Sequence, residues 1–193
     1  MRKKTENGAR RVLERAGAEF ETHTDGWRAH LGGSVVVYDD GGLSMAGNTE
    51  RLVPLLTDGG GAVTVEFDGA SRGNPGRSGV GYVLRDESGV VKRDGEVIGE
   101  ATNNEAEYVA LLHGLVEARE LGYTEVEAVG DSELVVNQVR GDWRCKAENL
   151  KPLHDEVVRT AEGFDGFGIR HVGRGANEGA DEAANVALDE GEE

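Results

Sequence analysis

The amino-acid sequence predicts an α/β protein: a five-stranded mixed sheet flanked by helices, preceded by a small α+β appendage. After residue 62, three strand patterns are joined by short turns, which is typical of an antiparallel meander. Helical and strand patterns then alternate to residue 188, which predicts parallel strands and helices on the sheet faces. A glycine-rich run at residues 57–61 separates this region from a shorter β-rich stretch. We therefore expect the order βββαβααβα to form one mixed sheet.

A chain of 193 residues has room for one standard domain and a small addition. Residues 1–60, which include most of the glycine linker, are expected to form the appendage, and residues 61–193 the main domain. Within residues 1–16, apolar side chains at helical spacing predict a short helix with a local charge of +4. The appendage could bind nucleic acid through this basic helix and a hairpin at Trp27, or it could be a stabilising or oligomerising module.

The rest of the appendage is expected to be a small sheet with one more helix. The dipeptides Asp25-Gly26 and Gly32-Gly33 are typical hairpin turns. They separate three predicted strands: Glu19–Thr24, Trp27–Leu31 and Val35–Tyr38. Asn48 or Thr49 can cap a helix that runs to Leu56.

In the main domain, apolar alternation between turn residues predicts strands at 63–67, 79–85, 90–98, 125–130 and 168–172. Periodicity near 3.6 predicts helices at 102–120, 132–139, 150–161 and 177–188. The first helix begins at the capping run Thr102-Asn103-Asn104 and ends before Gly122. Ser132 can cap the second helix, and Pro152 is tolerated in the first turn of the third.

The composition is strongly acidic. Asp and Glu total 37 against 21 Lys and Arg, and Arg outnumbers Lys by 16 to 5, for a net charge of -16. With few large aromatic residues, this balance indicates a protein adapted to concentrated salt, although an ordinary acidic protein remains the alternative. At low salt such a charge would repel the phosphates of a nucleic acid. At about 1 M salt the Debye length is only about 3 Å, so this repulsion is largely screened and a nucleic-acid partner is not excluded.

Several classes of protein are disfavoured. Cys145 is the only cysteine, so an internal disulfide is impossible and a reducing compartment is expected. The first residues are charged and lack the apolar segment of a signal peptide, and no run approaches the length of a membrane span. We expect a soluble, cytoplasmic protein without a membrane partner, and a monomer.

Four carboxylates mark the ends and starts of predicted elements. Asp68 and Asp131 end strands, whereas Glu107 and Asp181 lie in the first turns of helices. Clustered at one sheet edge, these acids would repel one another unless divalent cations bind, and oxygen ligands select Mg²⁺ or Mn²⁺. Taken alone, Asp68-Gly69 could equally be an Asp-Gly turn. No Cys/His set has zinc spacing, and no glycine-rich loop has the Walker pattern.

Residues 63–188 resemble a type 1 ribonuclease H. The similarity rests on four motifs in the family's order: FDGASRGNPG, TNNEAEYVAL, GDSELVVNQVRGDW followed by KAENLKPL, and HVGRGANEGADEAA. It implies the ribonuclease H-like fold and an endonuclease that cuts the RNA strand of RNA–DNA hybrids. It also implies two Mg²⁺ or Mn²⁺ ions per site and products with 5′-phosphate and 3′-hydroxyl ends.

The resemblance also assigns roles to residues. It implies that Asp68, Glu107, Asp131 and Asp181 are catalytic metal ligands, with Asp68 bridging both ions. His171 matches a histidine that assists product release or proton transfer, although a histidine at a strand end can lack a role. The positions that would contact the substrate are Asn74, Thr102, Asn103, Asn104, Arg174 and Asn177; the last two form an RxxN pattern like that of archaeal and plant-like members.

The chain departs from some bacterial members of this family in lacking a basic helical protrusion after Asp131. Other residues must then hold the hybrid, and the candidates are Trp143, Arg144, Lys146, Arg72, Arg77 and Arg174. Two alternative functions remain: a hybrid-binding module without catalysis, and another nuclease of the same fold, such as a resolvase or an exonuclease. The four acids disfavour the first, and the TNNxxE and GNPG motifs disfavour the second.

Overall fold

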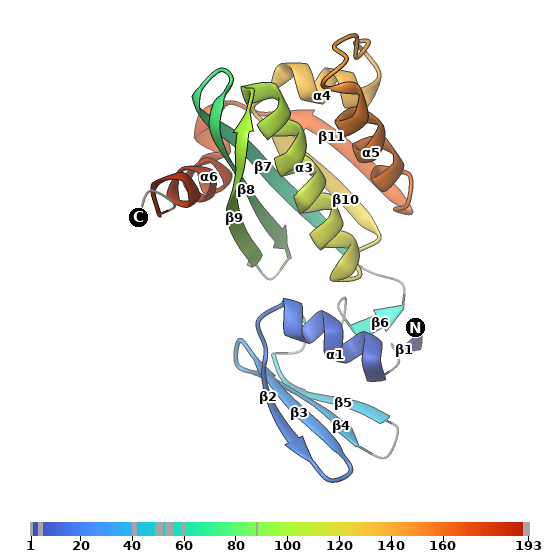
Figure 1. The fold of residues 1–193 in the computed structure, drawn as a ribbon. Helices are drawn as coiled ribbons and strands as arrows, with labels where there is room; N and C mark the ends of the chain where they lie inside the picture. Colours follow the sequence, from blue (N-terminus) through green and yellow to red (C-terminus); the bar gives the residue numbers. More distant parts are fainter. Residues whose placement is uncertain are drawn as a thin grey trace.

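The computed structural model describes residues 2–3, 6–39, 42–48, 52, 56–58, 61–87 and 89–190. These residues form two bodies, each built on its own sheet (Figure 1). The smaller body contains the first strands and a helix, and the larger body contains a mixed sheet with helices on both faces. The predicted fold class, a five-stranded mixed sheet behind a small α+β appendage, is confirmed. The exact boundary between two domains near residue 60 stays a prediction.

The appendage is an antiparallel sheet with helix α1 (Glu6–Arg15) packed against it. The strand order is β2-β3-β4-β5, formed by β2 (Glu19–His23), β3 (Gly26–Leu31), β4 (Ser34–Asp39) and β5 (Gly42–Gly47). The helix and the first three strands were predicted. Strand β5 was not predicted, because its sequence GLSMAG has little β-branched character.

Trp27 lies in the core of the appendage and is only 2% exposed. Its ring stacks on Tyr38 with 5.8 Å between the ring centroids, and the edge of Phe20 approaches at 5.4 Å. The alternation of strand β3 places Trp27 and Ala29 on the buried face. The indole is therefore not available to stack on a base, and binding of nucleic acid by other residues of the appendage stays one of the two alternatives.

The end of the appendage differs from the predicted linker. Thr57 and Asp58 form strand β6 (Thr57–Asp58), which pairs with β1 (Arg2–Lys3) at the start of the chain. Gly59 and Gly60 lie outside the described residues. Most of the helix predicted from Asn48 or Thr49 also lies outside them; its described members Leu52 and Leu56 are helical and buried.

The larger sheet has the order β11-β10-β7-β8-β9. Its strands are β7 (Ala62–Gly73), β8 (Gly76–Asp86), β9 (Gly89–Ala101), β10 (Glu125–Gly130) and β11 (Gly166–His171). The first three form an antiparallel meander, and β10 runs parallel to both β7 and β11. This mixture of directions agrees with the sequence prediction and brings the carboxyl ends of β7, β10 and β11 toward one edge.

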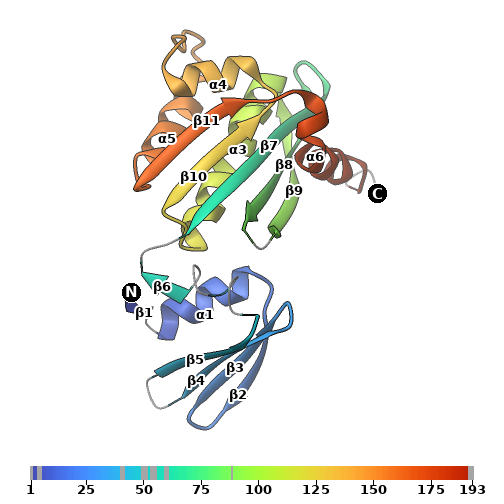
Figure 2. The same ribbon diagram turned by 180° about the vertical axis from the view of Figure 1, so that it is seen from behind.

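Helices cover the two faces of this sheet unequally. They are α3 (Asn103–Glu120), α4 (Glu133–Arg140), α5 (Lys151–Ala161), the 3₁₀ helix η1 (Arg174–Ala176) and α6 (Glu178–Glu190). Helices α3, α4 and α5 lie on one face, and α6 lies on the other, against β8 and β9 (Figures 1 and 2). The buried side chains of α3 pack against Val65, Phe67 and their neighbours. None of the described helices is long and apolar enough to cross a lipid bilayer.

The sequence pattern predicted that the first strand of the main domain ends at Asp68. In the structure, strand β7 continues five residues further, to Gly73. Asp68 pairs with Gly81 inside the β7–β8 ladder, and the reversal is confined to Asn74 and Pro75. The dipeptide Asp68-Gly69, which is common in turns, here serves a close approach to another element. Asp68 is therefore held more rigidly than a turn residue would be.

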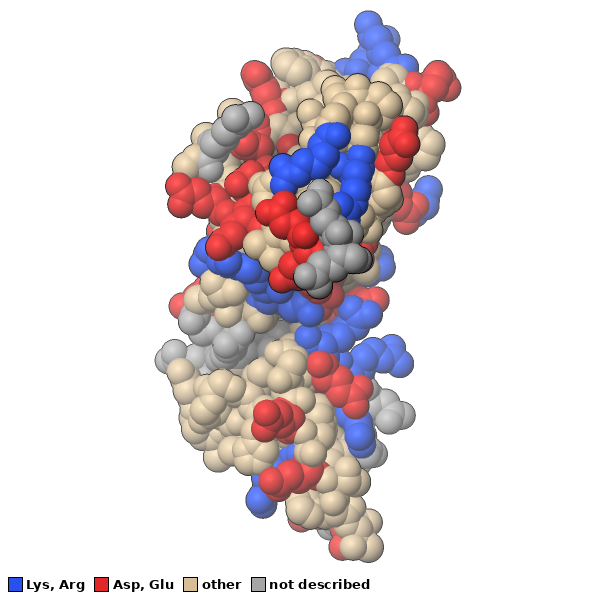
Figure 3. Space-filling view, turned by 60° about the vertical axis from the view of Figure 1, so that its left-hand side comes forward, with Lys and Arg blue, Asp and Glu red and all other residues tan. Residues whose placement is uncertain are grey.

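A cluster of charged side chains joins the two bodies. The Arg15 guanidinium of α1 lies 3.2 Å from a carboxylate oxygen of Glu117 on α3 and also pairs with Glu120. Lys and Arg side chains gather where the bodies meet (Figure 3). A cation at the carboxyl end of α3 is favourable, because this end of a helix carries partial negative charge.

Candidate active site

Three of the four predicted carboxylates meet at the edge where the parallel strands end. Asp68, Glu107 and Asp131 each offer one carboxylate oxygen, and these oxygens all lie within 4.8 Å of one another. Asp68 and Glu107 are 6% and 8% exposed, and Asp131 is half-buried. Three acids this close, two of them buried, would repel one another, and a bound cation would offset that repulsion.

The sheet brings Asp68 and Asp131 together. Strands β7 and β10 are parallel neighbours, and their register pairs Glu66 with Val129. Asp68 and Asp131 each follow two residues later, so they reach the same edge of the sheet. Adjacent parallel strands place their carboxyl ends side by side, and this geometry was expected from the sequence.

Gly69 brings Glu107 to the same place. A Cβ atom at Gly69 would lie 2.3 Å from the backbone nitrogen of Glu107 and 2.4 Å from the carbonyl carbon of Ala106. Only a residue without a side chain lets α3 approach β7 this closely. This role of Gly69 was not predicted, because an Asp-Gly pair is equally typical of a turn and of a close packing contact.

Asp181 lies outside the group of three. It is exposed in the first turn of α6, and its carboxylate accepts a hydrogen bond from the Asn185 side chain at 3.2 Å. The start of α6 is nevertheless anchored beside the site, because the Asn177 amide donates to the carbonyl oxygen of Phe67 at 2.8 Å. Phe67 directly precedes Asp68, so α6 begins next to the cluster.

Asn177 was predicted to contact the substrate, but its side chain is buried. It is 1% exposed, and its side-chain amide is engaged with strand β7. A side chain buried in this way cannot touch a nucleic acid, so we correct the prediction: Asn177 holds α6 against β7. The backbone of Arg174 lies in η1, and its side chain lies outside the described part of the structure.

His171 is beside the carboxylates at the end of β11. Its Nε2 atom lies 3.1 Å from the backbone oxygen of Asp131, and the residue is exposed to solvent. Strand pairing explains this position, since His171 is opposite Gly130 in the parallel ladder. An exposed imidazole at the edge of a carboxylate cluster can exchange protons with water.

The start of α3 is fixed by a capping box. The Glu105 backbone donates to the Thr102 hydroxyl at 3.3 Å, and the Thr102 backbone donates to the Glu105 carboxylate at 2.8 Å. The Asn149 amide donates to the other oxygen of that carboxylate at 3.0 Å. Hydrogen bonds from the Thr102 backbone, the Thr102 hydroxyl and Asn149 lower the pKa of Glu105. The role of Asn149 was not predicted, because nothing in the sequence brings it to this helix.

The other polar residues predicted to contact substrate surround this helix start. The Asn74 side chain accepts a hydrogen bond from the Asn103 backbone at 3.2 Å, which ties the β7–β8 turn to α3. Asn103 and Asn104 are exposed. They lie near the carboxylates and are open to a ligand from solvent.

The loop between α4 and α5 exposes Trp143. Its backbone is held by the carbonyl oxygen of Asn137 at 3.0 Å, and the Gln138 amide donates to the Arg144 carbonyl at 3.4 Å. Gln138 in turn accepts a 2.7 Å hydrogen bond from the buried Tyr108 hydroxyl. The loop is thus anchored to α3, although the Trp143 ring remains at the surface.

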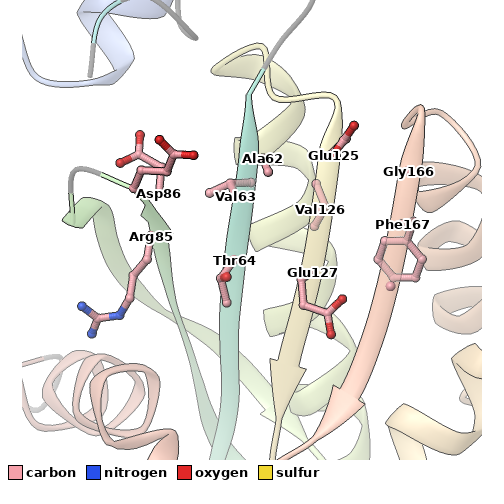
Figure 4. Close-up of a pocket in the computed structure, with 12 residues that line it drawn as sticks. Ala62, Val63, Thr64, Arg85, Asp86, Glu125, Val126, Glu127, Gly166 and Phe167 are labelled. Carbon is pink, nitrogen blue, oxygen red and sulfur yellow. The ribbon is translucent and has the colours of Figure 1, made fainter. Parts of the chain in front are cut away.

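A separate hollow of about 540 Å³ lies at the opposite end of the sheet, where β7, β10 and β11 begin (Figure 4). Its lining includes Thr64, Asp86, Glu125, Glu127 and Phe167. It contains none of the predicted site residues. The size of a hollow therefore does not identify the candidate active site in this protein, whereas the convergence of carboxylates does.

Known proteins share this arrangement of elements. A sequence model of the family described as "Reverse transcriptase-like" matches residues 66–187. Ribonuclease HI of Halobacterium salinarum is 41% identical over 188 residues, which cover 94% of each chain.

Solved structures of RNase H1 proteins share the fold of the main domain. The crystal structure of RNase H1 from Halobacterium salinarum NRC-1 superposes with a TM-score of 0.66 at 45% identity, over 67% of this chain and 99% of that one. LC11-RNase H1, solved in complex with an RNA/DNA hybrid, gives a TM-score of 0.64 at 35% identity, over 67% of this chain and 98% of that one. With this fold, these motifs and these relatives, the chain belongs to the ribonuclease HI family.

Proposed function

We propose that the protein is a divalent-metal-dependent endonuclease that hydrolyses the RNA strand of RNA–DNA hybrids. The observation that carries this proposal is the cluster of Asp68, Glu107 and Asp131, with carboxylate oxygens within 4.8 Å, at the end of a ribonuclease HI sheet. The relative solved with an RNA/DNA hybrid supports the choice of substrate. A module that only binds hybrids would have no need for three carboxylates held this close together.

The donor set fits hard divalent cations. It consists of carboxylate oxygens, the ligands that Mg²⁺ and Mn²⁺ prefer. When two such ions are bound, they would supply an activated water and stabilise the leaving oxygen, giving 5′-phosphate and 3′-hydroxyl ends. Asp68 would bind both ions, Glu107 and Asp131 the first, and Asp181 the second. Asp181 would approach from the start of α6, which Asn177 anchors beside Asp68.

His171 would move a proton at the edge of the site. Its imidazole is exposed and contacts the backbone of Asp131 through Nε2. A positioned imidazole can take a proton from an attacking water or give one to a leaving oxygen.

The substrate would lie across the start of α3. Asn103 and Asn104 are exposed there, with Asn74 and Thr102 supporting the backbone of the same segment. Hydrogen bonds to 2′-hydroxyl groups distinguish RNA from DNA. The exposed ring of Trp143 lies on the neighbouring loop and can pack against the nucleic acid backbone or a sugar. A monomer acting in the cytoplasm remains our expectation.

Four substrates test this function: an RNA–DNA hybrid, double-stranded RNA, double-stranded DNA, and a DNA duplex with a single ribonucleotide. We expect Mg²⁺- or Mn²⁺-dependent cleavage of the hybrid, with labelled products that carry 5′-phosphate and 3′-hydroxyl ends. Preferred cleavage of duplex DNA would instead indicate another nuclease of this fold. Hybrid binding without turnover would indicate a binding module.

A further inference from the structure

A second hollow lies in the main domain between helix α3 and strands β8 and β9, and we call it the α3–β9 hollow. Its volume is about 420 Å³, which is in the size range of small-molecule sites. Its apolar part is formed by Val80 and Tyr82 on β8 and by Leu112 and Val116 on α3. None of the residues proposed for catalysis or substrate contact lines it.

Carboxylates surround this apolar part. Asp94 and Glu96 project from β9, and Glu117 projects from α3. The only basic side chain among the lining residues is His113, whose Nδ1 lies 3.2 Å from Glu96. Lys92, 3.4 Å from Asp94, lies outside the lining. The hollow is therefore apolar inside and negatively charged around its rim.

Glu117 is the deepest of these acids and is 8% exposed. One carboxylate oxygen is 3.2 Å from Arg15 and accepts a 3.5 Å hydrogen bond from the Tyr82 hydroxyl. The other oxygen is buried and has no hydrogen-bond partner among the described residues. Burial and the Glu117 charge together raise the pKa of Tyr82, so its hydroxyl stays protonated and can donate. A buried carboxylate oxygen without a donor is costly, and a ligand that donates to it would remove that cost.

We propose that the α3–β9 hollow binds a small organic cation, namely an ammonium, amidinium or guanidinium group carried on an apolar stem. The apolar stem would cover Val80, Leu112 and Val116, while the cationic head would pair with Glu117 and with the rim carboxylates. A neutral apolar ligand of the same shape would desolvate these carboxylates without pairing them, which is unfavourable. An anion would be repelled by all three.

The site is connected to the appendage through one residue. Glu117 both lines the hollow and holds Arg15 of α1. A cationic ligand at Glu117 would share or replace that ion pair. Ligand binding is thus expected to change the environment of α1 as well as that of the hollow.

The test uses the full chain, labelled with ¹⁵N and kept in salt where its circular dichroism is that of the folded protein. Mg²⁺ is added so that the Asp68 cluster does not take up the probe. Benzamidine, a cation on an aromatic ring, is titrated against benzamide, which has nearly the same shape and no charge. We expect saturable shifts of amides in and around the hollow, including Gly95 and Val116, with affinity at least tenfold higher for benzamidine.

Two double variants separate the site from general attraction to an acidic protein. Asp94→Asn with Glu96→Gln is expected to weaken benzamidine binding at least fivefold. Asp155→Asn with Glu162→Gln removes two exposed carboxylates, one in α5 and one directly after it, and should change the affinity less than twofold. Asp155 also lies beside a histidine, His154, as Glu96 lies beside His113. Both leave the proposed catalytic residues intact.

Three results would overturn the proposal: no saturable shifts at the hollow, equal affinity for benzamide, or equal weakening by both double variants. The measurement does not involve RNA–DNA hybrids. Its outcome is therefore independent of the function proposed above.

Discussion

Gly69 sets the distance between strand β7 and helix α3, and with it the position of Glu107. We predict that Gly69→Ala lowers the free energy of unfolding by about 1–3 kcal/mol, because the added methyl group would overlap backbone atoms. Cleavage should fall at least tenfold, since a displacement of about 1 Å at a catalytic group can cost about 10²-fold. Urea unfolding and steady-state cleavage measure the two effects.

Gly175→Ala is the matched control, because a Cβ atom there would have no neighbour within 4 Å. It should resemble the wild type in both measurements. If Gly69→Ala were as stable and active as Gly175→Ala, the close contact between β7 and α3 would not control the site.

His171 is predicted to assist turnover without being indispensable. His171→Ala should reduce kcat, since a positioned acid or base is typically worth about 10²–10⁴-fold, while water can replace part of that function. His23→Ala, a change at an exposed strand residue of the appendage, should leave kcat unchanged. Equal kcat values for the two variants would show that His171 has no role in turnover.

At the scale of the elements, the two bodies are predicted to be separable. A protein consisting of residues 61–193 should fold and cleave hybrids with kcat within about threefold of the full chain, a difference under about 0.7 kcal/mol. These residues contain all four proposed metal ligands, Asp68, Glu107, Asp131 and Asp181. The solved halobacterial structure is matched over 99% of its length by 67% of this chain, which supports this expectation.

Circular dichroism and hybrid cleavage at the same salt concentration are the measurements. Weaker hybrid binding by the shortened protein would assign a substrate contact to the basic helix α1. An unfolded or inactive product would place the domain boundary elsewhere.

Most elements could be predicted because local pattern and tertiary role agree. Alternation placed the strands around Val65, and capping residues placed the start of α3 at Thr102. The meeting of Asp68 with Asp131 followed from parallel strand ends. These features depend on short stretches of sequence or on a general rule of sheet geometry.

The residue roles that could not be predicted depend on which elements pack against each other in the folded protein. Gly69 was assigned to a turn, although it serves contact with α3. The Trp27 hairpin was considered as one of two alternatives for nucleic-acid binding, although the Trp27 side chain itself fills the appendage core. Asn177 was assigned to the substrate, although it bonds strand β7. In each case the residue type permits two uses, and only a partner distant in the sequence decides between them.

At the scale of the whole molecule, the net charge of -16 is predicted to make folding depend on salt. At about 0.01 M salt the Debye length is near 30 Å, so repulsion acts across the entire protein, whereas at about 1 M it is near 3 Å. We expect helicity and hybrid cleavage to rise together between these concentrations, although high salt also weakens phosphate contacts. Millimolar Mn²⁺ should replace part of the salt by binding the native carboxylates.

Circular dichroism and cleavage across a NaCl series, with and without Mn²⁺, provide the measurement. A protein that is fully folded and most active at low salt without metal would contradict adaptation to concentrated salt. It would leave the proposed nuclease function intact.

The central claim is that the carboxylate cluster carries metal-dependent cleavage of hybrids. Its most direct test is a titration of Mg²⁺ and Mn²⁺ in single-turnover cleavage of a labelled RNA–DNA hybrid, using the wild type, Asp131→Asn and Glu133→Gln. Glu133 is an exposed acid two residues away and controls for the loss of one charge. We predict no cleavage by the wild type in EDTA, near wild-type rates for Glu133→Gln, and less than about a tenth of the wild-type rate for Asp131→Asn at saturating metal, a loss above about 1.4 kcal/mol. Cleavage without metal, or an Asp131→Asn protein that keeps more than this tenth while remaining folded, would contradict the account.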